Sequence, residues 1–330
     1  MKVRQKEEGK KEVTASLRSA GLACTNDRKV LNFMNTDANS NLADIVDRDN
    51  RFRVLRRLEE PWAKESDEPV RGRRRTLVLV DVETTGLDPE HDAIIELALM
   101  QVVVESEGDD LVHRIVSWTK PEEWLQDPGR EIPERISFLT GITDDAVAGE
   151  RIDDDRVLEV LSKADLIIAH NARFDRAFIE QRYLELGPRP WACSMSEIDW
   201  LTLEMDGKNL GYLLMQSGRF FQAHNAANDV WSLFKLLTHA PIRFQLLDAR
   251  TCLDLLLEAS DAESYRVEAL NAPFGFKDRL KSRGYKWDPK KKVWWTELGY
   301  PEYLRERDWF AELGLPSFVA TPIDATQRHL

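Results

Sequence analysis

Short apolar runs separated by turn residues follow one another after residue 72. TLVLVDVET (76–84), AIIELALMQVVVE (93–105) and LVHRIVSWTK (111–120) are rich in the β-branched and apolar residues that are typical of strands. LDPEHD and SEGDD supply the turns between them. Three strands joined by such short connections predict an antiparallel meander.

In the next segment, helical spacing of apolar residues alternates with one more strand. ADLIIAH (164–170) predicts a buried strand, and four further patterns predict helices: DDDRVLEVLSKA, NARFDRAFIEQRYLEL, NLGYLLMQSG and NAANDVWSLFKLLTH. Strands that are first antiparallel and then alternate with helices predict an α/β fold, a mixed β-sheet flanked by helices.

Both ends of the chain depart from this pattern. Residues 1–72 lack apolar periodicity and predict a largely disordered or weakly structured extension, with one short helix near 52–58. The core domain is expected at 73–245, followed by a helical connector, ARTCLDLLLEAS, within 246–264. Residues 265–330 predict a small α+β unit, strand–helix–strand–strand, closed by the helix PEYLRERDWFAELG. A cut after about residue 264 is therefore expected to leave the core domain intact.

The formal net charge of −12 conceals regions of opposite sign. Residues 1–75 carry 18 basic and 13 acidic side chains, net +5, and residues 265–330 carry 12 and 9, net +3. Residues 76–264 carry 16 and 36, net −20. An acidic centre does not attract a polyanion by its overall field, so a nucleic acid would have to be held by metal ions and local basic patches.

A chain of 330 residues with 42% hydrophobic content is long enough for one large core and a smaller satellite domain. No apolar run approaches the ~18 residues of a membrane span, and the first residues lack the apolar stretch of a signal peptide. Cys24, Cys193 and Cys252 lie far apart without a CxxC pair. This spacing disfavours zinc ligation and a disulfide framework, and it fits a reducing cytoplasm. Together with the lack of a long apolar run, it predicts a cytoplasmic protein with no membrane partner.

Four carboxylates and one histidine stand in three separated clusters beside these predicted elements. Asp81 and Glu83, separated by one residue near the end of a strand, project from the same face. Asp175 lies near the start of a helix after a buried strand, and His224 and Asp229 flank the start of another helix. Four acids without basic partners repel one another, and a pair of divalent cations relieves that repulsion. Such a pair suits hydrolysis of a phosphodiester.

A histidine is expected to act as the proton acceptor in this cleft. His224 lies in a predicted loop, and a neutral imidazole near pH 7 suits proton abstraction from a water. His170, at the end of the strand 164–170, competes for this role, and we favour a packing role for it. The turn after the acidic strand offers backbone N–H groups for a nucleotide's sugar or phosphate; it contains Thr84, Thr85 and Gly86.

DVETTGL, HNARFD and HNAAND, in this order and spacing, resemble the three motifs of the DEDDh 3′–5′ exonucleases. These include the proofreading epsilon subunit of bacterial DNA polymerase III and its stand-alone relatives. The resemblance covers about residues 76–240, and IPERISFLTGITDDAV and WACSMSEIDW also resemble segments of those relatives. It implies a ribonuclease H-like fold, two Mg²⁺ or Mn²⁺ ions, His224 as general base, and as metal ligands Asp81, Glu83, Asp175 and Asp229.

The resemblance also suggests where substrate binds and where this chain differs. The predicted substrate-binding residues are Thr84, Thr85, Gly86, Leu87, Asn171 and Phe174. Relatives often have HRAxDD as the third motif, whereas here Asn225 replaces a usual arginine and Asn228 a usual acid. Because His224 and Asp229 are both present, we expect an altered rate or substrate grip and no loss of chemistry.

Cations and aromatic residues interleave between Phe274 and Trp295, where eight Lys or Arg accompany two Asp. This combination is typical of surfaces that bind single-stranded nucleic acid. The alternative is that the tryptophans form a small core and the lysines keep it soluble. The segment also resembles a small Trp-rich module attached to DNA-processing proteins. The candidate residues for gripping nucleic acid are Lys277, Arg279, Lys281, Trp287, Trp294 and Trp295.

Together these features predict a metal-dependent exonuclease that removes mononucleotides from 3′ ends, most readily from single-stranded or frayed DNA, with a DNA polymerase or another replication or repair protein as a partner. An RNA 3′-exonuclease on the same fold is the nearest alternative, because sequence does not reveal the contacts near the terminal 2′ position. A non-catalytic, polymerase-associated nucleic-acid-binding subunit is the alternative from another class, and the complete set of five residues argues against it.

Overall fold

The computed structural model describes residues 51–66, 69–107, 112–239, 250–314 and 318–330. Leu55–Leu330 form one compact unit. Residues 1–50, most of the predicted N-terminal extension, lie outside the described residues. No helix in the described part of the chain is both long and apolar enough to cross a lipid bilayer.

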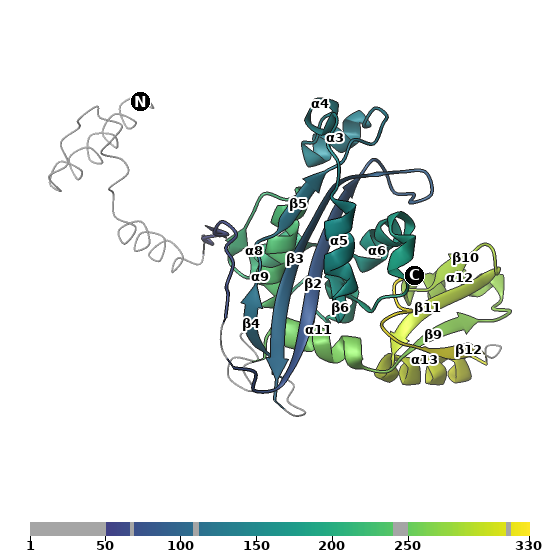
Figure 1. Ribbon diagram of the computed structural model, residues 1–330. Helices are drawn as coiled ribbons and strands as arrows, with labels where there is room; N and C mark the ends of the chain where they lie inside the picture. Colours follow the sequence, from purple (N-terminus) through teal and green to yellow (C-terminus); the bar gives the residue numbers. More distant parts are fainter. Residues whose placement is uncertain (1–50, 67–68, 108–111, 240–249, 315–317) are drawn as a thin grey trace, which may run out of the picture. The chain divides into compact units, whose positions relative to one another are not determined.

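A six-stranded mixed sheet forms the centre of this unit (Figure 1). The strand order is β4-β3-β2-β6-β7, with β5 beside β3. β2, β3 and β4 pair in antiparallel fashion, which confirms the predicted meander, whereas β6 and β7 continue parallel to β2. The strands are β2 (Arg73–Thr84), β3 (Ile94–Ser106), β4 (Arg114–Trp118), β5 (Glu122–Leu125), β6 (Leu166–Ala169) and β7 (Trp191–Cys193).

Helices cover both faces of this sheet because side chains alternate along each strand. Leu77 and Leu79 of β2 face a core built with α8, α9 and α11, whereas Val78 and Val80 face a second core built with α5 and α6. The predicted mixed sheet flanked by helices is confirmed. The helices are α3 (Glu134–Thr140), α4 (Asp144–Val147), α5 (Asp154–Ser162), α6 (Ala172–Arg182), the 3₁₀ turn η2 (Leu184–Leu186), α7 (Ser194–Glu197), α8 (Leu210–Gln216), α9 (Ala226–Leu237) and α11 (Cys252–Asp261).

A second, four-stranded sheet follows, in the order β10-β11-β9-β12, and we call residues 264–323 the C-terminal unit. α12 and α13 cover one face of this sheet, where Leu280 and Phe310 pack on Val267. The predicted strand–helix–strand–strand order with a closing helix is confirmed, and β12 adds one strand. The elements are β9 (Ser264–Ala269), η3 (Phe274–Phe276), α12 (Lys277–Ser282), β10 (Lys286–Asp288), β11 (Val293–Gly299), α13 (Tyr300–Glu312) and β12 (Val319–Ile323).

The prediction for residues 52–72 needs correction. No helix forms at 52–58; instead β1 (Arg56–Arg57) pairs in parallel with β8 (Arg219–Phe220). Leu58 is buried in the main core, and Trp62 packs edge-on against an aromatic ring of β4. The extended backbone here forms hydrogen bonds with the backbone of β8. Because β8 lies more than 150 residues further along the chain, local periodicity does not reveal this pairing.

The predicted boundaries near residues 246 and 265 are also corrected. α11 is no connector, because Cys252, Leu256 and Leu257 are buried in the main core beside α9. Residues 324–330, which we call the return segment, leave β12 and contact the main body (residues 55–261) again. The backbone N–H of Trp191 on β7 donates to the carbonyl of Ala325 at 2.8 Å.

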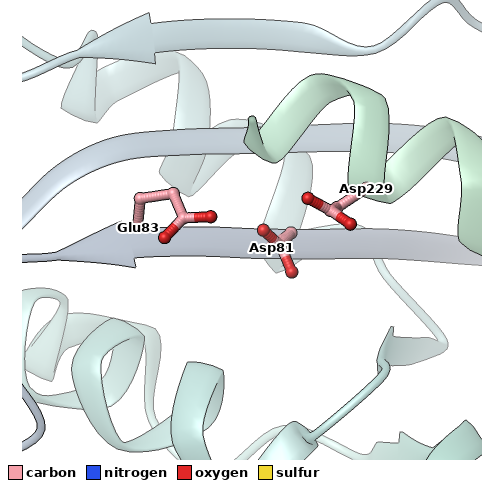
Figure 2. Close-up of side chains that lie close together, drawn as sticks. All are labelled: Asp81, Glu83 and Asp229. Atoms are coloured by element: carbon pink, nitrogen blue, oxygen red, sulfur yellow. The ribbon is translucent and has the colours of Figure 1, made fainter. Parts of the chain in front are cut away.

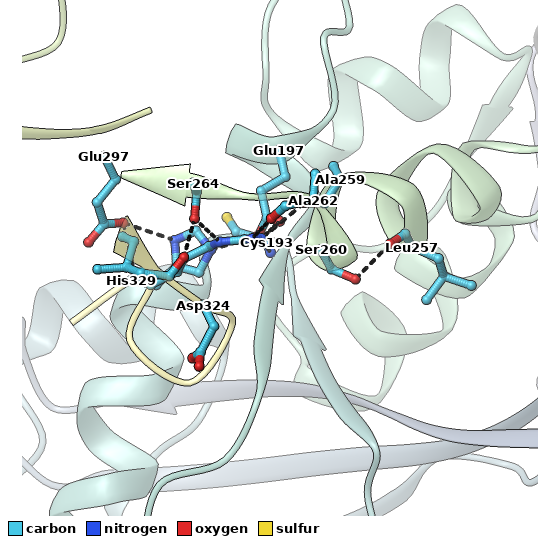
Figure 3. Close-up of polar contacts among 12 residues, drawn as sticks. Cys193, Glu197, Leu257, Ala259, Ser260, Ala262, Ser264, Glu297, Asp324 and His329 are labelled. Atoms are coloured by element: carbon cyan, nitrogen blue, oxygen red, sulfur yellow. Dashed lines mark hydrogen bonds and ion pairs between the residues drawn. The ribbon is translucent and has the colours of Figure 1, made fainter. Parts of the chain in front are cut away.

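The return segment also joins helix α7 to the C-terminal unit (Figure 3). The His329 ring lies 2.6 Å from a carboxylate oxygen of Glu197, and its backbone N–H donates to Glu297 of β11 at 3.0 Å. The C-terminal unit is therefore tied to the main body at several points, and the expectation that it can be cut away harmlessly is not supported.

Candidate active site

Three carboxylates converge at the end of β2 (Figure 2). Leu77 and Leu79 face α9, so Asp81 and Glu83 are the next two side chains on that face of the strand. Asp229 reaches the same place from the first turn of α9. One oxygen of each of the three carboxylates lies within 4.8 Å of the others.

Asp175 approaches from α6, on the other side of the sheet. β6 pairs with β2 only as far as Leu79, so the backbone N–H of Val82 lies beyond the end of β6. The buried Asp175 carboxylate accepts a hydrogen bond from that N–H at 3.2 Å. Its charge helps to raise the pKa of Asp81, which shows that the two are close. All four predicted acids are therefore brought to one place.

The electrostatics of this cluster suit divalent cations. Burial, reinforced by repulsion from Asp175 and the other acids, raises the pKa of Asp81 well above its usual value. Burial and the charge of Asp229 raise the pKa of Glu83 to about 7, and burial raises the pKa of Asp229 to about 6. Within the described residues, no lysine or arginine forms an ion pair with any of the four acids. Oxygen donors with uncompensated negative charge fit Mg²⁺ or Mn²⁺.

His224 lies at the start of the α9 region with an unusual backbone. Its φ is 66°, in the left-handed region that non-glycine residues rarely occupy. Its backbone N–H donates to an Asp229 carboxylate oxygen at 2.8 Å, and its side chain is exposed. Strained backbone of this kind is concentrated at functional sites. The hydrogen bond fixes the residue beside the acidic cluster while the imidazole stays accessible.

His170 is engaged by its surroundings through both ring nitrogens. Nε2 lies 2.7 Å from the carbonyl oxygen of Lys208, and Nδ1 lies 2.8 Å from the Ser194 hydroxyl. A carbonyl only accepts, so Nε2 carries a proton, and in the neutral ring Nδ1 accepts from the hydroxyl. Burial lowers the pKa of His170 and keeps it neutral. This environment agrees with the packing role that the sequence favoured.

Comparison with known proteins assigns this site to a family. A family model described as "Exonuclease" matches residues 78–237, the segment that contains all five candidate residues. Residues 78–237 form an exonuclease-family domain. The topology is that of the predicted ribonuclease H-like fold, and the family is one of hydrolytic nucleases.

Relatives among curated proteins share this domain. The chain is 37% identical over 110 residues to the PolC-type DNA polymerase III of Oceanobacillus iheyensis, covering 33% of this chain and 7% of that protein. It is 29% identical over 204 residues to the same type of polymerase from Staphylococcus haemolyticus, covering 58% and 13%. The chain thus spans a small part of these relatives. A solved structure of Exonuclease X in complex with 5′ overhanging duplex DNA is 22% identical, covers 56% of this chain and 99% of that one, and has a TM-score of 0.37.

One polar residue of the exonuclease domain escaped the sequence analysis. Glu96 stands opposite Glu83 in the β2–β3 register and is almost fully buried. Its carboxylate accepts from the backbone N–H of Ala226 at 2.9 Å and from the Asn225 amide at 2.7 Å. Glu96 thereby caps the start of α9, which carries Asp229. A single acid inside the apolar run AIIELALM was the available signal, because an isolated buried charge is costly.

Asn225, the departure from the family motif, has a defined structural role. Its side-chain oxygen accepts from the backbone N–H of Asn228 and so caps α9, and its amide also donates to Glu123 at 3.1 Å. The pKa of Glu96 is raised to about 8. Burial is the largest cause, and the hydrogen bond with Glu123 is the second. An amide at position 225 therefore links two acids and the helix start without adding a cation to the site.

The turn after β2 differs in part from its predicted role. The backbone N–H of Thr85 donates to the Ala93 carbonyl at 2.9 Å, and its hydroxyl accepts from Arg130 at 2.7 Å. Thr85 is thus used within the protein and is corrected to a structural residue. A Cβ at Gly86 would lie 2.3 Å from the Asp92 carboxylate, so any other residue there would force that side chain to move.

The remaining predicted substrate-binding residues differ in exposure. Leu87 is 84% exposed, and Asn171 is exposed at the start of α6, so both are available to a ligand. Phe174 packs on Phe178, with ring centroids 5.0 Å apart, and is partly buried. Thr84 is buried, and its hydroxyl donates to the Gly86 carbonyl.

The three candidate tryptophans of the C-terminal unit do not form one surface. Trp294 and Trp295 are neighbours on β11 and therefore point to opposite faces of the sheet. Trp294 lies beside Trp287 on the helix-covered face, with ring centroids 5.4 Å apart. Trp295 is only 6% exposed, so it cannot stack on a base, and that prediction is wrong. Trp287 is 47% exposed and remains a candidate.

The candidate cations Lys277, Arg279 and Lys281 all lie on α12. The charged groups of Lys277 and Arg279 are 5.6 Å and 5.3 Å from the rings of Phe274 and Phe276. These cations share the helix-covered side of the unit with Trp287, away from Trp295.

The raised pKa values make a testable prediction about metal-free protein. Groups whose folded-state pKa exceeds the unfolded value contribute stability below the unfolded pKa and lose it as pH rises through the folded pKa. For Glu83 that window runs from its ordinary pKa of 4.5 to about 7. For Asp229 it runs from an ordinary pKa of 3.8 to about 6. Thermal denaturation in EDTA should therefore show stability falling across this range. Added Mg²⁺ or Mn²⁺ should lessen the fall, because the ions bind the ionised acids; an equal fall with and without the ions would contradict it.

Proposed function

We propose that this chain is a 3′–5′ exonuclease that hydrolyses phosphodiester bonds at the 3′ ends of DNA and releases mononucleotides. The observation that carries the proposal is the convergence of four carboxylates, without cationic partners among the described residues, inside an exonuclease-family domain. The names of the curated relatives, which are DNA polymerases, support DNA as the substrate and a polymerase or replication setting. We also propose a cytoplasmic location, which the cysteine spacing led us to expect.

In this proposal the four acids hold two divalent cations, Mg²⁺ or Mn²⁺: Asp81, Glu83, Asp175 and Asp229. When bound, such cations neutralise charge on the scissile phosphate and make the attacking water more acidic. The exposed imidazole of His224 accepts the proton of that water. Glu96 keeps the first turn of α9 in place, so that His224 and Asp229 keep their relative position.

A single assay tests polarity, sugar and metal dependence. Purified protein is incubated with DNA and RNA oligonucleotides labelled at the 5′ or the 3′ end, with Mg²⁺, with Mn²⁺ or with EDTA. We expect 5′-labelled DNA to shorten in single-nucleotide steps, 3′-labelled DNA to release labelled mononucleotide first, and EDTA to stop both. Preferential shortening of RNA would support the RNA exonuclease instead. Binding without cleavage would support a non-catalytic subunit.

The two histidines should behave differently when replaced. We choose His224→Asn because asparagine tolerates the left-handed backbone of this position, so the variant removes the imidazole without adding backbone strain. It should lower single-turnover hydrolysis by roughly 10²–10⁴-fold, the usual contribution of a general base, with little change in DNA affinity. His170→Asn should chiefly lower the thermal midpoint, because it disturbs the hydrogen bonds that both ring nitrogens make. A deeper kinetic defect in His170→Asn than in His224→Asn would assign the base to His170.

A further inference from the structure

Three cations surround the buried ring of Trp295 at the junction between α6 and the C-terminal unit. Arg266 of β9 lies 3.9 Å from the ring centroid, Arg173 of α6 lies 5.1 Å away, and Lys286 of β10 lies 5.8 Å away. Trp295 therefore brings a residue of the active-site helix beside the C-terminal sheet. Arg173 stands in the first turn of α6, two residues before Asp175.

These cations differ in how their charge is balanced. Arg266 is neutralised by Glu268 at 3.0 Å and faces Asp288 at 3.9 Å. Arg173 and Lys286 are exposed and, within the described residues, have no carboxylate within ion-pair distance. The charge of Glu297 acts on Lys286, but this carboxylate already accepts a hydrogen bond from the backbone N–H of His329.

Arg173 and Lys286 are also close enough to repel each other. Partial desolvation and the charge of Arg173 both lower the pKa of Lys286. Two cations held together without an acid form a site that an anion would stabilise, and a phosphodiester offers oxygens to both the guanidinium and the ammonium. Arg173 stands in the same helix turn as Asp175, in a chain whose middle region is strongly acidic.

We propose that Arg173 and Lys286 together bind a phosphodiester of the substrate strand as it leaves the active site, so that the C-terminal unit completes the substrate-binding surface. This inference rests on the proposed function. In this proposal Trp295 no longer binds the nucleic acid itself. Its buried ring packs against the two cations and does not touch a base. Trp287, the residue after Lys286 on the same edge strand, points to the helix-covered face and is not part of this site.

The test is Lys286→Gln, compared with Lys286→Arg and with a control, Arg305→Gln. Arg305 lies on α13, which covers the opposite face of the same unit, so the control removes the same charge elsewhere. Binding of fluorescent single-stranded DNA is measured by anisotropy in EDTA, where no turnover occurs, with strands of about 4 and about 16 nucleotides. KM is measured with the same strands in Mg²⁺.

For the longer strand, Lys286→Gln should weaken binding roughly tenfold and raise KM, as expected when a charged hydrogen bond is lost. The slope of log affinity against log salt should become shallower by about 0.7, one phosphate contact of a single strand. Lys286→Arg should retain affinity, and Arg305→Gln should match the wild type. If Lys286→Gln matches Arg305→Gln in affinity and salt slope, the inference is wrong.

The outcomes separate this inference from the proposed function. Lys286-dependent binding without hydrolysis would overturn only the exonuclease proposal, because the anisotropy is measured without turnover. Stepwise 3′–5′ hydrolysis with affinity and KM unchanged in Lys286→Gln would overturn only the phosphate site. A thermal midpoint equal to that of the wild type should accompany the variant, since the Lys286 side chain is exposed.

Discussion

Replacing Asp81 or Asp229 with asparagine is expected to lower turnover by about 10³-fold or more. Divalent cations contribute several kcal/mol of transition-state stabilisation, and each 1.4 kcal/mol is about a tenfold change in rate. Asparagine keeps the shape of the side chain and removes its negative charge, so a cation loses an anionic ligand. Single-turnover hydrolysis of a 5′-labelled strand measures the effect.

The same variants should make the metal-free protein more stable, which distinguishes a lost ligand from a damaged fold. Burial and mutual repulsion raise the pKa values of both acids, so their ionised forms oppose folding near neutral pH. Removing one charge should raise the thermal midpoint in EDTA and reduce the added stabilisation by Mn²⁺. Asp145→Asn, in the exposed first turn of α4, is the matched control and should change neither quantity. Near wild-type turnover in an Asp81→Asn/Asp229→Asn double variant would refute the metal-dependent mechanism.

Deleting the return segment, residues 324–330, should destabilise the whole enzyme and lower its turnover. Arg176 of α6 is 2% exposed, and its guanidinium donates to the carbonyls of Thr326, at 2.7 Å, and of Arg328. The deletion leaves this guanidinium with the Glu180 carboxylate, which accepts from its Nε at 2.7 Å. Each hydrogen bond to a charged group contributes about 1.5–3 kcal/mol, so losing both carbonyl acceptors should cost several kcal/mol. Because Arg176 follows Asp175 directly, the position of that acid should be disturbed as well.

Arg328 adds a second reason for this expectation. It is 5% exposed and donates to Ser264 at 2.8 Å, to Glu197 at 3.0 Å and to the Ala259 carbonyl at 3.0 Å, which joins the C-terminal unit to α7 and α11. Circular dichroism melting of the full chain and the shortened chain measures the loss. Adding Arg176→Met to the shortened chain should recover part of it, since the unsatisfied charge is then absent. A shortened chain with an unchanged melting temperature and turnover would contradict the assigned role.

Local patterns were sufficient for the long central strands of the exonuclease domain. TLVLVDVET and AIIELALMQVVVE predicted β2 and β3 within a few residues, because strands buried on both faces require continuous apolar runs. They were insufficient where a segment pairs with a distant partner. Residues 52–58 carry an apolar pattern compatible with a helix, and only the backbone groups of β8 select the extended form.

The motifs alone were enough to predict which acids form the cluster, since Asp81 and Glu83 share a strand face and the other motifs stand beside predicted strands and helices. The contacts that support these acids depend on how distant segments meet in the folded chain. The β2–β3 register places Glu96 opposite Glu83, and strand alternation separates Trp294 from Trp295. Arg176 and Arg328 illustrate the reason: as charged residues they are expected at the surface, and they are buried only because segments 64 to 152 residues apart in the chain meet and satisfy their hydrogen bonds.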